Sequence, residues 1–126
     1  MKPVCLVLGA GAGIGGTVGK RFAKEGYHVV LCRRSDEDGL VNMVKEIEEA
    51  GGSASGFLIN AIEDNSIEDR VAAIEADIGP IEVAIYNLGA QIGDRALKDT
   101  SAKAFEMGWR MGTFGLYRLA SSLCPL

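Results

Sequence analysis

The sequence predicts an α/β domain built on a parallel sheet, and three observations lead to that fold class. Short apolar segments alternate with segments of helical apolar spacing, four times along the chain. The apolar segments are too uniformly apolar for strands that have one solvated face. Glycines, 17 among the 126 residues, repeatedly follow the ends of these segments. A sheet covered by helices on both faces satisfies all three.

Two strands and a helix are predicted at the start of the chain. Residues 4–8 form a short, continuous apolar run that stops at a glycine, which is typical of a strand buried on both faces. A helix follows over residues 15–25, with its apolar residues on one face, and Gly26 ends it. Residues 27–32 form the second apolar run and the second strand.

The second helix is predicted from Leu40, Val44 and Ile47, which recur at helical spacing with charged residues between them. Asp36 or Asp38 can cap its start, because both carboxylates precede the first apolar position. The glycine pair after residue 50 ends it.

Two further strand–helix pairs complete the pattern. Residues 54–60 are the predicted third strand, and residues 66–78 are a helix that a Gly-Pro pair closes. Residues 82–87 are the fourth strand, and residues 101–123 are a long final helix. Helical crossovers between apolar strands imply a parallel sheet, and no linker or repeat divides the chain.

Composition limits the functional classes. With 48% hydrophobic and 24% charged residues, the chain is neither disordered nor of low complexity. No apolar run reaches the roughly 18–20 residues of a membrane span, and a net charge of −4 argues against a nucleic-acid partner. Cys5, Cys32 and Cys124 lack disulfide or zinc spacing. We therefore expect buried reduced thiols, a surface His28, no metal site and a cytoplasmic setting.

A glycine-rich turn lies between the first strand and the first helix. Gly11, Gly13 and Gly16 fit the GxGxxG spacing of dinucleotide-binding sites. Gly9, Gly13 and Gly15 fit a second spacing, GxxxGxG. In either case, free amides and the positive end of the helix can bind a pyrophosphate. A P-loop is excluded because no Gly-Lys-Ser/Thr follows, and a tight turn without a ligand remains the alternative.

The end of the second strand indicates which dinucleotide is preferred. An acidic residue there would bind a ribose 2′-hydroxyl, whereas arginine accepts a 2′-phosphate. Arg33 and Arg34 follow the strand directly, and Asp36 comes only later. This order favours NADP over NAD, and two solvated surface arginines are the alternative.

The motifs resemble those of one family. Gly9, Gly13, Ile14 and Gly15 are similar to the TGxxxGIG turn of short-chain dehydrogenases/reductases, with Leu8 in place of the usual threonine or serine. The other matching positions are Arg33 at the NADP-selecting position, Asn60 and Ala61 for the Asp-Val pair beside the adenine, and Asn87 and Gly89 in the NNAG motif, where Tyr86 and Leu88 differ.

The resemblance implies a Rossmann-like, doubly wound sheet of strand order 3-2-1-4 and hydride transfer between a nicotinamide and a carbonyl or alcohol. Family members use a tyrosine with a lysine four residues later, and no YxxxK occurs in these 126 residues. The family's relay asparagine would fall at Gly112. Gly108, Gly112 and Gly115 are instead interpreted as a small-residue stripe for close helix packing.

We therefore expect residues 1–126 to be a Rossmann-like NADP(H)-binding domain, truncated before the catalytic half and prone to form homo-oligomers. No catalytic residue is assigned. The leading hypothesis is the cofactor-binding part of an oxidoreductase. The alternatives are a non-catalytic dinucleotide-binding or regulatory module, and an interaction fragment without ligand. Four polar residues after the fourth strand either border a substrate or form a solvated loop, namely Gln91, Asp94, Arg95 and Lys98.

Overall fold

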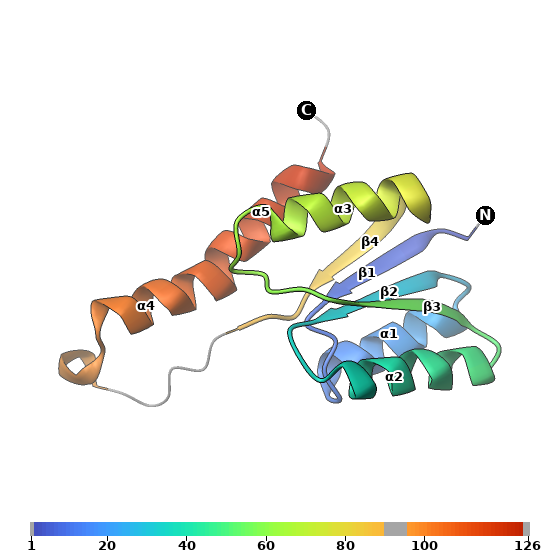
Figure 1. Cartoon of the computed structure of the whole chain (residues 1–126), viewed down its shortest axis with the longest axis horizontal. Coiled ribbons are helices and arrows are strands. Elements are labelled where there is room, and N and C mark those ends of the chain that lie inside the picture. The colour runs from blue at the N-terminus through green and yellow to red at the C-terminus, as the bar shows by residue number, and fades with distance from the viewer. Residues whose placement is uncertain (1, 90–95, 125–126) are drawn as a thin grey trace.

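A parallel sheet forms the centre of the computed structural model, which describes residues 2–89 and 96–124 (Figure 1). The sheet order is β3-β2-β1-β4, and each neighbouring pair of strands runs parallel. The predicted α/β fold with strand order 3-2-1-4 is therefore confirmed. The strands are β1 (Val4–Leu8), β2 (His28–Arg33), β3 (Ser53–Leu58) and β4 (Ile81–Tyr86).

Helices cover both faces of this sheet. Figure 1 shows α1 and α2 below it and α3 and α5 above it, and each pair encloses its own apolar cluster. None of the helices within residues 2–89 and 96–124 is both long and apolar enough to cross a membrane. The helices are α1 (Ile14–Lys24), α2 (Glu37–Glu49), α3 (Ser66–Asp77), α4 (Ala102–Trp109) and α5 (Gly115–Leu123), with a short 3₁₀ turn η1 (Leu97–Asp99) and a π-helical segment η2 (Arg110–Phe114).

The central strand β1 explains the uninterrupted apolar run at the start of the sequence. Leu6 and Leu8 pack into the core beneath α3 and α5, whereas Cys5 and Val7 pack against α1 and α2. All five residues of the strand are buried, because helices cover both of its faces. Burial also raises the pKa of the Cys5 thiol to about 11, so this thiol stays protonated.

The start of α2 settles which aspartate caps that helix. Asp36 takes a left-handed conformation, with φ 61°, and its carboxylate accepts a hydrogen bond from the amide of Gly39 at 3.1 Å. The helix begins at the next residue. Asp38 lies in its first turn, where its negative charge interacts favourably with the positive end of the helix dipole and stabilises the helix.

The predicted final helix has the expected span but is not uniformly α-helical. In η2 the amide of Gly115 donates to the carbonyl of Arg110, five residues back. The hydroxyl of Tyr86, from β4, donates to the carbonyl of Met111 in the same segment. A side chain that bonds into the helix ladder is a known cause of such an irregularity. The preceding helix, α4, extends away from the sheet and has no buried residue (Figure 1).

Two side-chain expectations are wrong. Cys124 is exposed rather than buried, because it follows the last turn of α5 and faces solvent. His28 is half-buried rather than on the surface, because it lies in β2 beside β3. Its Nδ1 and Nε2 lie 2.5 and 2.9 Å from the hydroxyl oxygens of Ser53 and Ser55.

Candidate functional site

The glycine-rich turn lies at the carboxyl end of β1 and is tied to the end of β4. Gly9 has φ +92°, which favours glycine, and a β-carbon there would collide with the carbonyl oxygen of Asn87. Asn87 donates from its backbone amide to the carbonyl of Leu8 at 2.8 Å and from Nδ2 to the carbonyl of Gly9 at 3.3 Å. Asn87 therefore fixes the turn against the sheet.

The remaining glycines of the turn fall into two groups. At Gly15 and Gly16 a β-carbon would collide with the carbonyl oxygens of Gly9 and Gly11, so these glycines let the helix start pack on the turn. At Gly11 and Gly13 an added β-carbon would meet no atom of the chain within 4 Å. The turn thus leaves open space beside Gly11 and Gly13.

The start of α1 faces that open space without a cap. Gly13 has no side chain to bond the first amides, and the first turn holds no acidic residue. Among the described residues, the amides of Ile14 and Gly15 have no hydrogen-bond acceptor. By contrast, α2 begins with the Asp36 cap and two acidic residues. The positive end of α1 is therefore available to an anion.

A small pocket brings five of the predicted site residues together beside the turn. It encloses about 20 Å³ between the ends of β1, β2 and β3. Its predicted members are Gly9, Arg33, Arg34, Asn60 and Ala61, and its other lining residues are Leu8, Cys32, Ile59, Leu88 and Met111.

The other predicted residues lie around this pocket. Gly13, Ile14 and Gly15 form the start of α1, where the side chain of Ile14 is 73% exposed. Asn87 links the turn to β4, as described above. Gly89 is exposed, and a β-carbon there would meet nothing within 4 Å, so no close packing requires glycine at this position.

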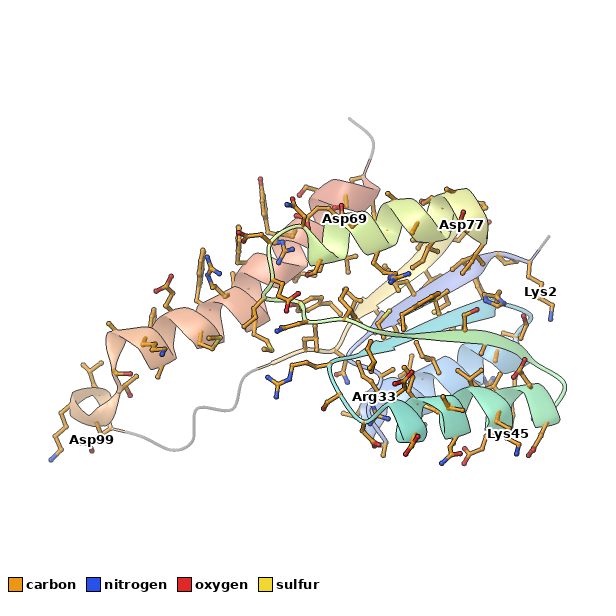
Figure 2. The ribbon with its side chains drawn as sticks, viewed as in Figure 1. Lys2, Arg33, Lys45, Asp69, Asp77 and Asp99 are labelled. Carbon is orange, nitrogen blue, oxygen red and sulfur yellow. The ribbon has the colours of Figure 1, made fainter. Side chains whose placement is uncertain are left out.

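Arg33 lies where two pockets meet, at the carboxyl end of β2 (Figure 2). The second pocket, of about 210 Å³, lies between the glycine turn and α2 and is also lined by Lys20 and Asn42. The side chain of Arg33 is 17% exposed, and its Nη1 lies 3.7 Å from the carboxylate of Asp36. Arg34, in contrast, is exposed.

Asn60 is oriented by its own loop. Its Oδ1 accepts a hydrogen bond from the amide of Ile62 at 3.3 Å, which forms a local turn after β3. This bond fixes the side-chain amide, and among the described residues its Nδ2 has no acceptor. Asn60 therefore presents a hydrogen-bond donor at the wall of the small pocket.

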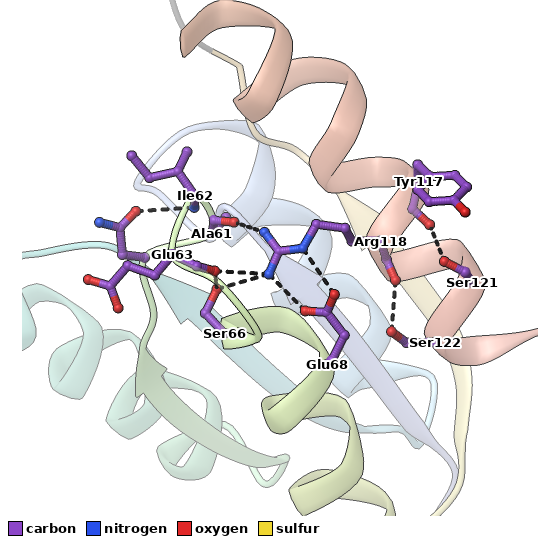
Figure 3. A network of polar contacts seen from close by, with 10 residues as sticks. Ala61, Ile62, Glu63, Ser66, Glu68, Tyr117, Arg118, Ser121 and Ser122 are labelled. Atoms are coloured by element: carbon purple, nitrogen blue, oxygen red, sulfur yellow. Dashed lines mark hydrogen bonds and ion pairs between the residues drawn. The ribbon is translucent and has the colours of Figure 1, made fainter. Parts of the chain in front are cut away.

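A buried arginine that the sequence analysis missed supports the same loop. Arg118 of α5 is 7% exposed and donates to the carbonyl of Ala61 and to the carboxylate of Glu68 (Figure 3). The hydrogen bond between the two side chains lowers the pKa of Glu68 and raises the pKa of Arg118. An arginine on the buried face of a helix, between Gly115 and Leu119, was the available signal.

The predicted small-residue stripe is only partly present. Gly115 is buried, and a β-carbon there would collide with the hydroxyl of Tyr86. Gly112 is exposed and a β-carbon there would meet nothing within 4 Å, so its expected packing role is wrong. Of the four polar residues expected after β4, Lys98 is exposed in η1, and Gln91, Asp94 and Arg95 lie outside the described residues.

Comparison with known families matches residues 3–126 to the short chain dehydrogenase model. The chain belongs to the short-chain dehydrogenase family. It is 35% identical over 124 residues to a fatty acyl-CoA reductase from Acinetobacter baylyi, which covers 97% of the chain. It is 41% identical over 86 residues, 68% of the chain, to a gluconate 5-dehydrogenase from Gluconobacter oxydans.

A solved structure shares the fold over nearly the whole chain. An actinorhodin polyketide ketoreductase variant with NADPH matches 97% of the chain with a TM-score of 0.88 and 32% identity. The match spans 46% of that ketoreductase, 41% of the acyl-CoA reductase and 33% of the gluconate dehydrogenase. This short-chain dehydrogenase chain therefore spans less than half the length of each of these proteins.

Proposed function

We propose that the chain binds NADP(H) and forms the dinucleotide-binding part of a reductase or dehydrogenase that acts on a carbonyl or alcohol. The observation that carries the proposal is the uncapped start of α1, which faces open space at Gly11 and Gly13 beside the Asn60 pocket. A pyrophosphate is the anion that suits this combination, because glycine lets it approach the free amides. The NADPH-bound ketoreductase relative supports the same assignment.

Different residues of the site contact different parts of the dinucleotide. The amides of Ile14 and Gly15 bind the pyrophosphate, and Gly13 leaves room for it. Asn60 and Ala61 border the adenine, toward which Asn60 offers its free Nδ2. When bound, the nicotinamide supplies or accepts the hydride. The chain's own contribution is to hold and orient the cofactor at the carboxyl end of the sheet.

Arg33 is the proposed contact for a 2′-phosphate. It borders both pockets and is already held in place by Asp36 and by partial burial. Its guanidinium can bind a phosphate through two parallel hydrogen bonds. Arg34 is exposed at the same rim of the small pocket and adds a second positive charge.

The test is a titration of the chain with NADPH and NADH, followed by fluorescence or calorimetry. We expect NADPH to bind more tightly, and Arg33→Ala to weaken NADPH binding by about tenfold or more, the effect of losing a hydrogen bond to a charged group. Binding of NADH should change little. Arg21→Ala, which removes an exposed arginine that pairs with Glu25 on α1, is the matched control. Equal affinities, or a preference that survives Arg33→Ala, would contradict the NADP assignment.

A non-catalytic dinucleotide-binding module is the second candidate function. It is favoured by Gly112, which stands where the family's relay asparagine would fall and cannot supply an amide. A carbonyl-reduction assay with the 126-residue chain and NADPH tests whether this chain is catalytic by itself. Dinucleotide binding without turnover fits a module or the binding part of a larger enzyme, and turnover by this chain would show that it carries its own catalytic groups.

Self-association is part of the proposal. Large apolar side chains are exposed along the long helix, and such a surface favours association. Measuring the mass in solution by light scattering tests this, and a monomer at all concentrations would contradict it. The exposed residues are Phe105, Trp109, Leu116 and Tyr117.

A further inference from the structure

We propose that Arg118 is a positioning residue for the adenosine end of the dinucleotide site, which it holds in place through the loop between β3 and α3. The inference rests on the proposed function, because it assigns Arg118 a role in that same site. Arg118 itself lies behind the loop and does not line the pocket. Among the described residues, it reaches the pocket through its hydrogen bonds to the loop that carries Ala61 and Glu63.

The contacts of Arg118 converge on one short segment of the chain. Its Nη1 donates to the carbonyl of Ala61, and its Nη2 donates to the carbonyl of Glu63 at 2.9 Å (Figure 3). Nη2 also lies 3.5 Å from the hydroxyl of Ser66. Two backbone carbonyls and a hydroxyl of residues 61–66 are thus bound by a single side chain, which comes from a helix more than fifty residues away.

The carboxylate of Glu68 fixes the guanidinium in this orientation. Its Oε1 lies 2.7 Å from Nη2 and its Oε2 lies 3.1 Å from Nε, so the pair is bidentate. The buried positive charge therefore has a partner, and Nη1 and Nη2 can also bond the loop carbonyls. Lysine could not make this arrangement, because its ammonium group lacks the rigid fork of donors.

The loop needs such an anchor because its own hydrogen bonds are local. Beyond β3, the amide of Ile59 donates to the carbonyl of Arg33 and ties the loop to β2. The next bonds run within the loop, from Ile62 and Glu63 to Asn60 and from Ser66 to Glu63. Arg118 fixes the other end of the segment against α5. Asn60 and Ala61, the two residues that border the pocket, lie between these anchors.

The experiment compares two probes on variants of the 126-residue chain. Adenosine 2′,5′-bisphosphate reports on the adenosine end, and inorganic pyrophosphate reports on the start of α1. We expect Arg118→Lys to weaken the adenosine bisphosphate at least fivefold and to leave pyrophosphate binding within twofold. Amide hydrogen exchange should accelerate over residues 60–66 and stay unchanged over residues 9–16. Arg21→Lys, in the exposed pair with Glu25, is the matched control.

A second variant keeps the test decisive if Arg118→Lys unfolds. Glu68→Gln keeps the size of the side chain and leaves Arg118 with its two loop carbonyls. We expect it to fold and to weaken adenosine bisphosphate binding more than pyrophosphate binding, because the carboxylate no longer fixes the guanidinium against the loop. Unchanged binding of both probes by a folded Glu68→Gln would overturn the inference. Equal weakening of both probes in either variant would overturn the inference, since it would indicate a general loss of structure. Unchanged binding and exchange in a folded Arg118→Lys would also overturn it. Absence of any binding by the wild-type chain would instead refute the proposed function, and the assigned role of Arg118 with it.

Discussion

At Gly13 a β-carbon would meet no atom of the chain within 4 Å, whereas at Gly15 it would collide with the carbonyl oxygen of Gly9. Two neighbouring residues of one motif therefore have different reasons to be glycine. Gly15 is needed by the folded chain itself, because the helix packs directly on the turn. Gly13 is not, and the proposed function assigns the space beside it to the pyrophosphate of the dinucleotide.

This difference predicts opposite outcomes for two alanine variants. Gly13→Ala should keep the free energy of unfolding within about 0.5 kcal/mol of the wild-type value. It should weaken NADPH binding at least tenfold. Gly15→Ala should destabilise the fold by about 1–3 kcal/mol, because the new methyl group is overpacked. Urea unfolding and NADPH titration of both variants measure these effects. Unweakened NADPH binding by Gly13→Ala would contradict the assignment of the open space to the cofactor.

Sequence reasoning correctly placed the residues whose position depends on near neighbours, while their roles in binding stay predictions. The glycine turn, Arg33 and Asn60 each follow directly from a strand end, and the carboxyl ends of parallel strands meet at one edge of the sheet. It missed Arg118 and the hydroxyl of Tyr86. Their partners lie 25 or more residues away in the chain, and which atoms meet depends on how the helices pack on the sheet.

At the scale of elements, η2 is the place where the sequence pattern and the structure differ. The periodicity predicts one continuous α-helix, whereas the structure has a π-helical segment over Arg110–Phe114. The change depends on one contact from β4. The phenol of Tyr86 fills the space next to Gly115, and its hydroxyl donates a hydrogen bond to the carbonyl of Met111. Burial raises the pKa of Tyr86, so the phenol stays protonated and can donate this bond.

Tyr86 and Gly115 should therefore show energetic coupling. Gly115→Ala alone should destabilise the chain by about 1–3 kcal/mol, although alanine is the better helix former, because the methyl group meets the phenol. In the background of Tyr86→Phe, which removes the hydroxyl, the same substitution should cost less. A double-mutant cycle by urea unfolding measures the difference, and additive effects of the two substitutions would show that the contact is not the cause.

At the scale of the whole molecule, two titrating groups make the stability sensitive to acid. Burial lowers the pKa of His28 from its ordinary value of 6.5, with a smaller contribution from Lys2. The hydrogen bond from Arg118 lowers the pKa of Glu68 from 4.5. In both cases the unfolded chain binds a proton at a higher pH than the folded chain. Each group therefore stabilises the fold fully above its ordinary pKa and loses that stabilisation as the pH falls below it.

The free energy of unfolding should accordingly fall in two steps on acidification. The first begins below pH 6.5 and belongs to His28, and the second begins below pH 4.5 and belongs to Glu68. Urea unfolding between about pH 8 and pH 2 measures both. His28→Gln should remove the first step and keep the second. A first step of full size in this variant would show that other groups cause it.

The position of β1 has a consequence for the order in which the strands of the sheet can pair. Its two neighbours in the sheet are β2 and β4, and the pairing with β4 joins Leu8 to Tyr86. On a ribosome, β1 is made before the other three strands of this sheet, and its second edge is hydrogen-bonded only when β4 is present. Until β4 has emerged, one side of an entirely apolar strand is open to pairing with any other extended chain. During synthesis of the residues between β1 and β4, this apolar strand therefore carries an unpaired edge that can pair with other chains.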